Sequence, residues 1–371
     1  MITIAGAVAI EAIETQTLDQ PSPEHRAAGV ASVAAHYGDP MREQRTLDTA
    51  VGLVDRSHRG VIAIPGVDRA GWLHSITTQH LAVLSTDQGT ELLVLSPNGH
   101  VEHAAQLLDD GETTWLDTEP GRTADLLAFL QKMVFMTRVA PRDATAEMAV
   151  LSLVGPDVDK ALAVLDIPPL AEPTIAEVPG PKFASASVAK SATSAYPVVA
   201  VPGGGFARRG RLGVDLLVPR GQVAELAERL ATAGVPAAGL WAYEALRVAA
   251  RLPRVGWETD HRTIPAEVEL TGPAVHLDKG CYRGQETIAR VHNLGRPPRR
   301  LVLLHLDGIA TDQPPASQTP VTTVEGRTIG FVGTAVRHYE LGQIALAVIK
   351  RNTPDDAELR VGEQAASIDA A

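Results

Sequence analysis

Cysteine is almost absent from this chain: Cys281 is the single cysteine in 371 residues. One cysteine excludes an intramolecular disulfide, a Cys-x-x-Cys redox pair and a cysteine-rich zinc site within this sequence. It also excludes an iron–sulfur cluster held by thiolates of this chain alone, because such clusters take about four. So few cysteines are typical of a reducing compartment.

Long apolar runs and a basic excess are also missing. No run approaches the ~20 apolar residues of a membrane span. The first 16 residues lack a basic n-region and contain Glu11 and Glu14, which does not fit a signal peptide. The 33 basic and 44 acidic residues give a net charge of -11, which repels phosphate backbones. We therefore expect a cytoplasmic protein with no membrane or direct nucleic-acid partner.

The sequence is that of a folded α+β protein of two or three domains, from its length and its 45% hydrophobic content. Two segments about ninety residues apart, 61–77 and 150–166, each predict a strand, a glycine, an Asp cap and a helix. We expect Asp68 and Asp157 to accept hydrogen bonds from first-turn amides. This repeat of the same pattern predicts two related lobes.

Further periodicity predicts helices over 23–37, 121–132, 222–233 and 240–251 and a strand over 134–140. After residue 300 the pattern is all strand, as in a small barrel. The expected domains are an N-terminal extension with a helix (1–40), a first α+β lobe (41–145), a second α+β lobe (146–298) and a C-terminal β-barrel (299–371).

The densest motif is Lys279-Gly280-Cys281-Tyr282-Arg283-Gly284-Gln285-Glu286. We expect a turn over 279–283 and a helix that opens at 284–286, with its free N–H groups directed toward the thiol. Such a helix end and the flanking cations, Lys279 and Arg283, favour a thiolate. A lone cysteine is otherwise usually a small buried hydrophobe. The glycines and charged side chains around Cys281 argue against a buried position, because burying charged groups without partners costs several kcal/mol.

Other candidate sites are weaker. The histidines include no His-Glu-x-x-His pair, so no permanently bound metal is expected. The glycine-rich stretch 203–205 matches neither phosphate-loop template and predicts a hairpin, with Arg208, Arg209 and Arg211 available to an anionic ligand tail. A Cys-His-Asp hydrolase built on Cys281 stays open, although no cysteine-protease signature surrounds the thiol.

The eight-residue motif resembles the K-G-C-Y-x-G-Q-E signature of the YgfZ family at every fixed position. These are folate-binding proteins implicated in iron–sulfur cluster assembly or repair. Residues 52–79 and several later segments resemble the wider family that includes the aminomethyltransferase T-protein of glycine cleavage. Residues before about Met41 fall outside the resemblance.

The resemblance implies an α+β, aminomethyltransferase-like fold: two α+β lobes and a C-terminal β-barrel around a central cavity, with tetrahydrofolate near the middle. A folate site needs carboxylates or amides for the pterin and cations for the anionic tail. The residues of suitable chemistry are Lys279, Tyr282, Gln285, Glu286, Arg290 and Glu102.

Two departures separate the chain from the transferases. Where they carry a paired Asp-Asp, this chain has Glu102-His103, and where their helix carries a glutamate this chain has Ala249. Glycine-cleavage chemistry is therefore poorly supported by this alignment.

The resemblance and these departures favour three functions over the hydrolase. The leading one is a tetrahydrofolate-binding accessory protein that assists assembly, repair or maintenance of iron–sulfur clusters in client or assembly proteins. In it Cys281 is the catalytic residue, as cluster ligand, nucleophile or redox-sensitive thiol. The alternative is a folate-dependent one-carbon (aminomethyl) transferase or demethylase. A third reading, favoured by Ala249, is a scaffold that no longer binds folate.

Overall fold

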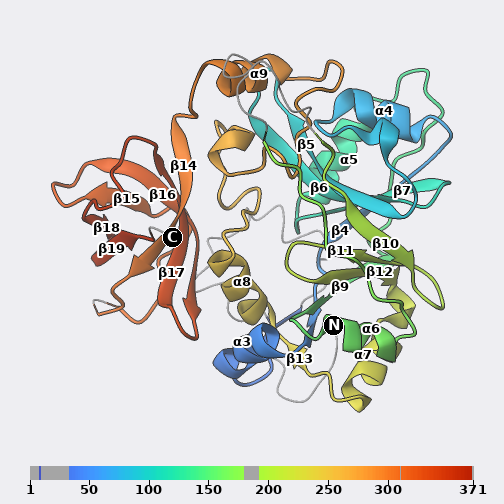
Figure 1. Ribbon diagram of the computed structural model, residues 1–371, viewed down its shortest axis with the longest axis horizontal. Coiled ribbons are helices and arrows are strands. Elements are labelled where there is room, and N and C mark those ends of the chain that lie inside the picture. The colour runs from blue at the N-terminus through green and yellow to red at the C-terminus, as the bar shows by residue number, and fades with distance from the viewer. Residues whose placement is uncertain (1–7, 10–32, 179–191, 310, 370–371) are drawn as a thin grey trace.

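The structure, a computed structural model, describes residues 8–9, 33–178, 192–309 and 311–369. It has an α+β fold whose C-terminal strands form a separate barrel (Figure 1). The helices of the described part are α3 (Pro40–Thr49), α4 (Arg69–Ile76), α5 (Thr123–Lys132), α6 (Val158–Val164), α7 (Val223–Thr232), α8 (Leu240–Ala249) and α9 (Gln285–Leu294).

Eleven strands of the described residues form one continuous sheet, in the order β13-β3-β9-β12-β11-β10-β5-β6-β7-β4-β8. Their bounds are β3 (Gly52–Asp55), β4 (Gly60–Pro65), β5 (Gln88–Leu95), β6 (Val101–Asp109), β7 (Thr113–Thr118), β8 (Arg142–Asp143), β9 (Met148–Val154), β10 (Tyr196–Ala200), β11 (Phe206–Arg209), β12 (Val214–Pro219) and β13 (Ala237–Ala238). The halves meet where β10 pairs with β5 through Tyr196 and Gly89. β3 comes from the expected first lobe, yet it pairs with β9 of the expected second lobe, so the sheet continues across the boundary expected after residue 145.

The repeated strand–glycine–helix unit is confirmed as β4–α4 and β9–α6. Gly66 and Gly155 have nearly equal φ values of 133° and 131°. A Cβ would lie 2.0 Å from the Arg138 carbonyl oxygen at Gly66 and 2.2 Å from that of Ala50 at Gly155. Only glycine fits both turns.

The two Asp side chains of these units do not cap their helices. Asp68 and Asp157 occupy the N-cap positions, but neither makes a side-chain hydrogen bond to the helix amides. Asp68 instead accepts hydrogen bonds from the backbone and guanidinium of Arg138, and Asp157 pairs with Lys160. In both units the aspartate side chain therefore pairs with a basic side chain instead of capping the helix.

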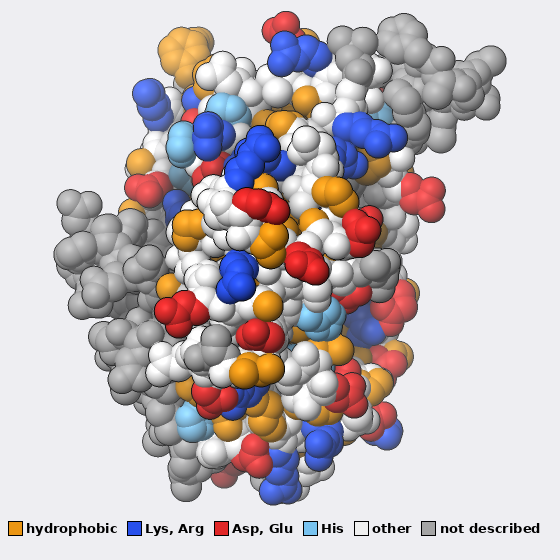
Figure 2. Space-filling view, turned by 90° about the vertical axis from the view of Figure 1, so that its left-hand side faces the viewer, with side chains coloured by type: hydrophobic (Ala, Val, Ile, Leu, Met, Phe, Trp, Pro, Cys, Tyr) orange, Lys and Arg blue, Asp and Glu red, His pale blue; other side chains and the backbone are white. Residues whose placement is uncertain are grey.

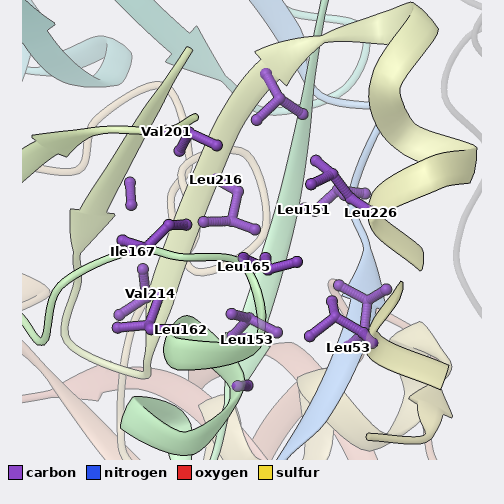
Figure 3. Packing of buried hydrophobic residues seen from close by; sticks show 14 of the residues in the cluster. Leu53, Leu151, Leu153, Leu162, Leu165, Ile167, Val201, Val214, Leu216 and Leu226 are labelled. Carbon is purple, nitrogen blue, oxygen red and sulfur yellow. The ribbon is translucent and has the colours of Figure 1, made fainter. Parts of the chain in front are cut away.

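The core of the second half lies between the sheet and helices α6 and α7. Figure 3 shows Leu151 and Leu153 of β9 and Leu216 of β12 packed toward Leu162 and Leu226 of these helices. Every residue of β9 is buried, which explains why the strand is apolar except for Ser152.

Two predictions of local structure are wrong. Residues 134–140 contain no strand: Met136 has a φ of 52°, which lies outside the β region, and the Trp72 indole donates to the carbonyl oxygen of Met133, just before the segment, at 3.0 Å. The end of the helix expected over 23–37 is a strand, β2 (Ala34–His36), which pairs with β1 (Val8–Ala9). Residues 23–32 lie outside the described residues.

The predicted C-terminal barrel is confirmed: six strands of the described part close in the order β14-β17-β16-β15-β18-β19. They are β14 (Arg299–Leu306), β15 (Pro320–Thr323), β16 (Thr328–His338), β17 (Gly342–Lys350), β18 (Leu359–Val361) and β19 (Gln364–Ile368). α8 lies between this barrel and the sheet (Figure 1). A bulge in β16 near Gly333 and Thr334 adjusts the barrel wall that faces α8.

The outer face of the barrel is mixed in charge. Figure 2, which views that side, shows acidic and basic side chains interspersed, with Lys and Arg gathered toward its upper part. In the described residues no helix combines the length and apolar character needed to cross a membrane.

We predict that Gly333→Ala destabilises the chain, because a Cβ there would lie 2.6 Å from Oε1 and 2.7 Å from Cγ of the buried Glu258. Overpacking of this kind costs about 1–3 kcal/mol. Urea denaturation measures the loss. Gly71→Ala is the control, since nothing lies within 4 Å of a Cβ at that exposed helical position. An unchanged free energy of unfolding in Gly333→Ala would contradict the close packing of the barrel on Glu258.

Candidate functional site

The KGCYRGQE motif forms the turn before α9, as predicted. Gly284 is the N-cap of α9 with a φ of 81°, and Gln285 begins the helix. A Cβ on Gly284 would lie 2.5 Å from the Ser96 carbonyl oxygen, in the turn between β5 and β6. A Cβ on Gly99 in that turn would lie 2.7 Å from the Thr287 Cβ. The two glycines therefore let the motif pack directly on the β5–β6 turn.

Cys281 lies on a short exposed arch. Gly280 and Cys281 are exposed, whereas Lys279 and Tyr282 on either side are buried. The Tyr282 ring packs among apolar side chains that include Ile288, and burial raises the pKa of its hydroxyl. This hydroxyl has no hydrogen-bond partner among the described residues. The thiol thus faces solvent between two buried neighbours.

The cation expected on one side of the thiol is turned inward. The Lys279 ammonium donates to three carbonyl oxygens at the end of α4 and just beyond it, those of His74, Thr77 and Gln79. These acceptors match its three N–H donors. Burial lowers the pKa of Lys279 to about 8.

The cation on the other side also has a carboxylate partner. Arg283 forms an ion pair with Glu102 of β6, with 3.0 Å between the nearest nitrogen and oxygen. Its guanidinium lies 5.9 Å from the centre of the Phe129 ring. The structure therefore brings Glu102 to the motif, as a partner of Arg283.

The remaining expected folate contacts lie on the first turns of α9. The Gln285 side chain donates to the Lys279 carbonyl oxygen at 3.3 Å. Glu286 and Arg290 are exposed. The motif thus presents a thiol, a carboxylate and a guanidinium at the surface.

A chain of buried charges, which was not predicted from the sequence, lies at the centre of the molecule. We call it the ion-pair chain; in order of contact its members are Asp215, Arg208, Asp117, Arg59, Glu119, Arg254, Glu244, Arg247 and Glu258, and Arg56 joins it at Asp215. Nitrogen-to-oxygen distances run from 2.5 to 3.5 Å. The five carboxylates and five guanidinium groups balance in formal charge.

The ion-pair chain connects the parts of the fold. Asp215 lies on β12 and Asp117 on β7, in different halves of the sheet. Arg247 of α8 also donates to the Thr334 hydroxyl of the barrel at 2.7 Å. Single charged residues inside apolar strands, such as Asp215 in VDLLVP, were the sequence signal that could have found it.

The middle of the ion-pair chain is partly open. Side chains of Glu119, Glu244 and Arg254 retain 15 to 18% exposure although they lie between sheet and α8. Burial and the neighbouring Arg254 and Arg56 lower the pKa of His58 to about 3, and its Nδ1 has no partner among the described residues. Neutral imidazole, carboxylate and guanidinium groups therefore lie close together at this part of the ion-pair chain.

The arginines of the glycine-rich hairpin also have carboxylate partners. Arg208 belongs to the ion-pair chain, Arg209 pairs with Glu172, and Arg211 pairs with Glu91 at 3.1 Å. In the described residues no group of three or more His, Cys, Asp or Glu is placed to hold a metal ion.

We predict that Glu244→Gln destabilises the protein most at neutral pH. Burial raises the pKa of Glu244, but Arg247 and Arg254 outweigh it and bring the pKa from 4.5 to about 2. The ionised form thus stabilises the fold above about pH 4.5, and this contribution is lost as the pH falls toward 2. At pH 7 the substitution removes charge-assisted hydrogen bonds of about 1.5–3 kcal/mol.

Thermal unfolding from pH 7 to pH 2.5 measures the effect. The gap between wild type and Glu244→Gln should narrow on acidification, whereas Glu112→Gln, at an exposed position, should match wild type throughout. A gap that stays constant with pH would show that Glu244 is not held ionised by its arginines.

Comparison with known proteins places this geometry in a family context. An aminomethyltransferase of Symbiobacterium thermophilum is 29% identical over 314 residues, which cover 80% of this chain and 78% of the relative. A putative chloroplastic transferase of Arabidopsis thaliana is 26% identical over 284 residues, 76% of this chain but only 61% of the plant protein.

The crystal structure of the glycine cleavage system aminomethyltransferase T from Bartonella henselae superposes with a TM-score of 0.73 at 20% identity, covering 92% of this chain and 93% of that one. The predicted aminomethyltransferase-like fold is confirmed by this likeness. The model of the GCVT N-terminal domain matches residues 34–279, which is more than half of the sequence. The chain therefore belongs to the GCVT N-terminal domain family, which relates it to the aminomethyltransferases.

Proposed function

We propose that this protein binds tetrahydrofolate and uses Cys281 to assist iron–sulfur clusters in client proteins. The observation that carries the proposal is the exposed thiol of Cys281, on an arch fixed between two buried residues of a motif that matches the YgfZ signature at every fixed position. A structural cysteine would lie in the core. An exposed one is available to a partner.

The thiol supplies one ligand. When Cys281 binds iron, its proton leaves to solvent and a sulfur–iron bond forms, without any change in oxidation state. The remaining ligands of a cluster come from the client protein, because this sequence holds no second cysteine.

The part-exposed middle of the ion-pair chain has the chemistry that a folate needs. A pterin presents amide and amine N–H groups. Carboxylates such as those of Glu119 and Glu244 accept hydrogen bonds from groups of this kind. Arg254 offers a cation, and His58 an unpaired ring nitrogen. Tetrahydrofolate, when bound, supplies a carrier of one-carbon groups. The residues of this chain would orient it between α8 and the sheet.

The contacts predicted around the motif extend this site outward. We propose Glu102, Gln285, Glu286 and Arg290 for the end of the ligand nearer α9, where Arg290 suits an anionic tail. Lys279 and Tyr282 support these residues from the interior.

A second candidate is folate-dependent one-carbon transfer. The relatives favour it more directly than they favour iron–sulfur chemistry, because the plant and bacterial proteins described above are a putative transferase and an aminomethyltransferase. One-carbon transfer needs folate bound in the same place, but it gives Cys281 no role. The two candidates therefore differ in their dependence on the thiol.

We predict saturable binding of tetrahydrofolate in calorimetric titration, weakened at least tenfold by Glu119→Gln. The substitution removes a charged acceptor from the partly open middle of the ion-pair chain. Glu112→Gln, in the exposed turn between β6 and β7, is the control and should bind as wild type. Absence of saturation at micromolar concentrations would remove folate from both candidates.

We predict that Cys281→Ser fails to restore an iron–sulfur enzyme in cells that lack the wild-type protein. The hydroxyl of serine is a poor ligand for iron where a thiolate is a good one. Ala289→Ser places a hydroxyl at an exposed position of α9 and keeps the thiol, so it should restore the enzyme fully. Equal restoration by both variants would contradict the role of Cys281.

Incubation with tetrahydrofolate and a panel of methylated amines separates the candidates. Our proposal predicts no methylenetetrahydrofolate. Formation of this product at the same rate by wild type and Cys281→Ser would establish the transferase instead.

A further inference from the structure

The residues on either side of the exposed arch contact each other. The Lys279 ammonium lies 5.0 Å from the centre of the Tyr282 ring, within the range of a cation–π interaction. Three residue steps span at most about 11 Å of extended chain. The arch of Gly280 and Cys281 is therefore short and closed at its base.

The carbonyl oxygens that hold Lys279 belong to a fixed segment. Thr78 donates from its backbone to a carbonyl of β5, and its hydroxyl donates to the Ala274 carbonyl oxygen at 2.6 Å. The Thr78 carbonyl oxygen accepts from the His276 backbone at 3.0 Å. The Gln79 amide donates to the Pro273 carbonyl oxygen at 3.1 Å. Residues 77–79 are thus joined both to the sheet and to the stretch that leads into the motif.

Lys279 completes this arrangement. The carbonyl oxygens of His74, Thr77 and Gln79 converge on its ammonium. The Thr78 carbonyl oxygen is instead satisfied by the His276 backbone. Three donors meet three acceptors, and the cation lies at the helix end where positive charge is favourable. Burial and nearby Lys279 lower the pKa of His74 to about 4, so that imidazole is neutral and the ammonium is the local cation.

We propose that Lys279 is a positioning residue whose ammonium fastens the motif to the end of α4 and so fixes the exposed arch that carries Cys281. This inference rests on the proposed function only where it predicts a weaker restoration of an iron–sulfur enzyme in cells. The position of the arch itself is a separate, measurable property.

The single cysteine makes Cys281 a natural labelling site, since no other thiol competes in the sequence. A nitroxide attached there reports the mobility of the arch in its electron paramagnetic resonance line shape. Lys279→Met removes the charge and its donors but keeps the side-chain length. We expect the rotational correlation time of the label to fall at least threefold. Lys132→Met, an exposed lysine at the end of α5, is the matched control and should leave the line shape unchanged.

Circular dichroism and thermal unfolding establish that each labelled variant is folded. A folded Lys279→Met with the wild-type line shape would overturn the proposal. If Lys279→Met does not fold, Lys279→Arg takes its place, because a planar guanidinium keeps the charge but cannot direct its donors to three oxygens around one nitrogen. A looser arch in folded Lys279→Arg supports the proposal, and an unchanged one overturns it.

The cellular readout separates this inference from the proposed function. Unlabelled Lys279→Met should restore the iron–sulfur enzyme less than Lys132→Met does. A looser arch with full restoration would contradict the role of Cys281 in clusters while the positioning role of Lys279 stands.

Discussion

The fold depends on keeping ten charged side chains paired at its centre. Taking a carboxylate or guanidinium out of water costs several kcal/mol unless an opposite charge and hydrogen bonds compensate it. The ion-pair chain meets this requirement by alternating sign from Asp215 on β12 to Glu258 beside the barrel. Neither half of the sheet holds its own charges in balance, since Arg208 of β11 pairs with Asp117 of β7, and Arg247 of α8 reaches the barrel through Thr334. The parts of the molecule are therefore coupled electrostatically as well as by packing.

The same constraint gives the molecule its two chemically distinct regions. Where the ion-pair chain crosses from the sheet to α8, Glu119 and Arg254 stay partly exposed and offer polar groups to a flat, amide-rich ligand. At the turn between β5 and β6, the motif packs on Gly99 and presents a thiol to solvent. The ligand site proposed for the interior and the thiol exposed at the surface are therefore separate regions of the molecule.

Much of the fold could be predicted from sequence because its signals are local. The strand–glycine–helix units, the turn before α9 and the all-strand C-terminal barrel follow from periodicity and glycine placement over short windows. The loop over 134–140 was misjudged because its contacts are with residues distant in sequence: the Ala140 backbone donates to the Pro65 carbonyl oxygen. Asp68 failed as a cap for a similar reason, since Arg138 reaches it. The inward turn of Lys279 and the ion-pair chain depend on partners distant in sequence, which periodicity does not reveal.

The central claim is that a reduced folate lies against the ion-pair chain, between α8 and the sheet. A crystal structure of the protein with tetrahydrofolate tests it most directly. The account predicts the pterin within hydrogen-bond distance of Glu119 or Glu244, with Arg254 and His58 nearby. A pterin bound elsewhere, with both carboxylates still engaged only by their arginines, would contradict it.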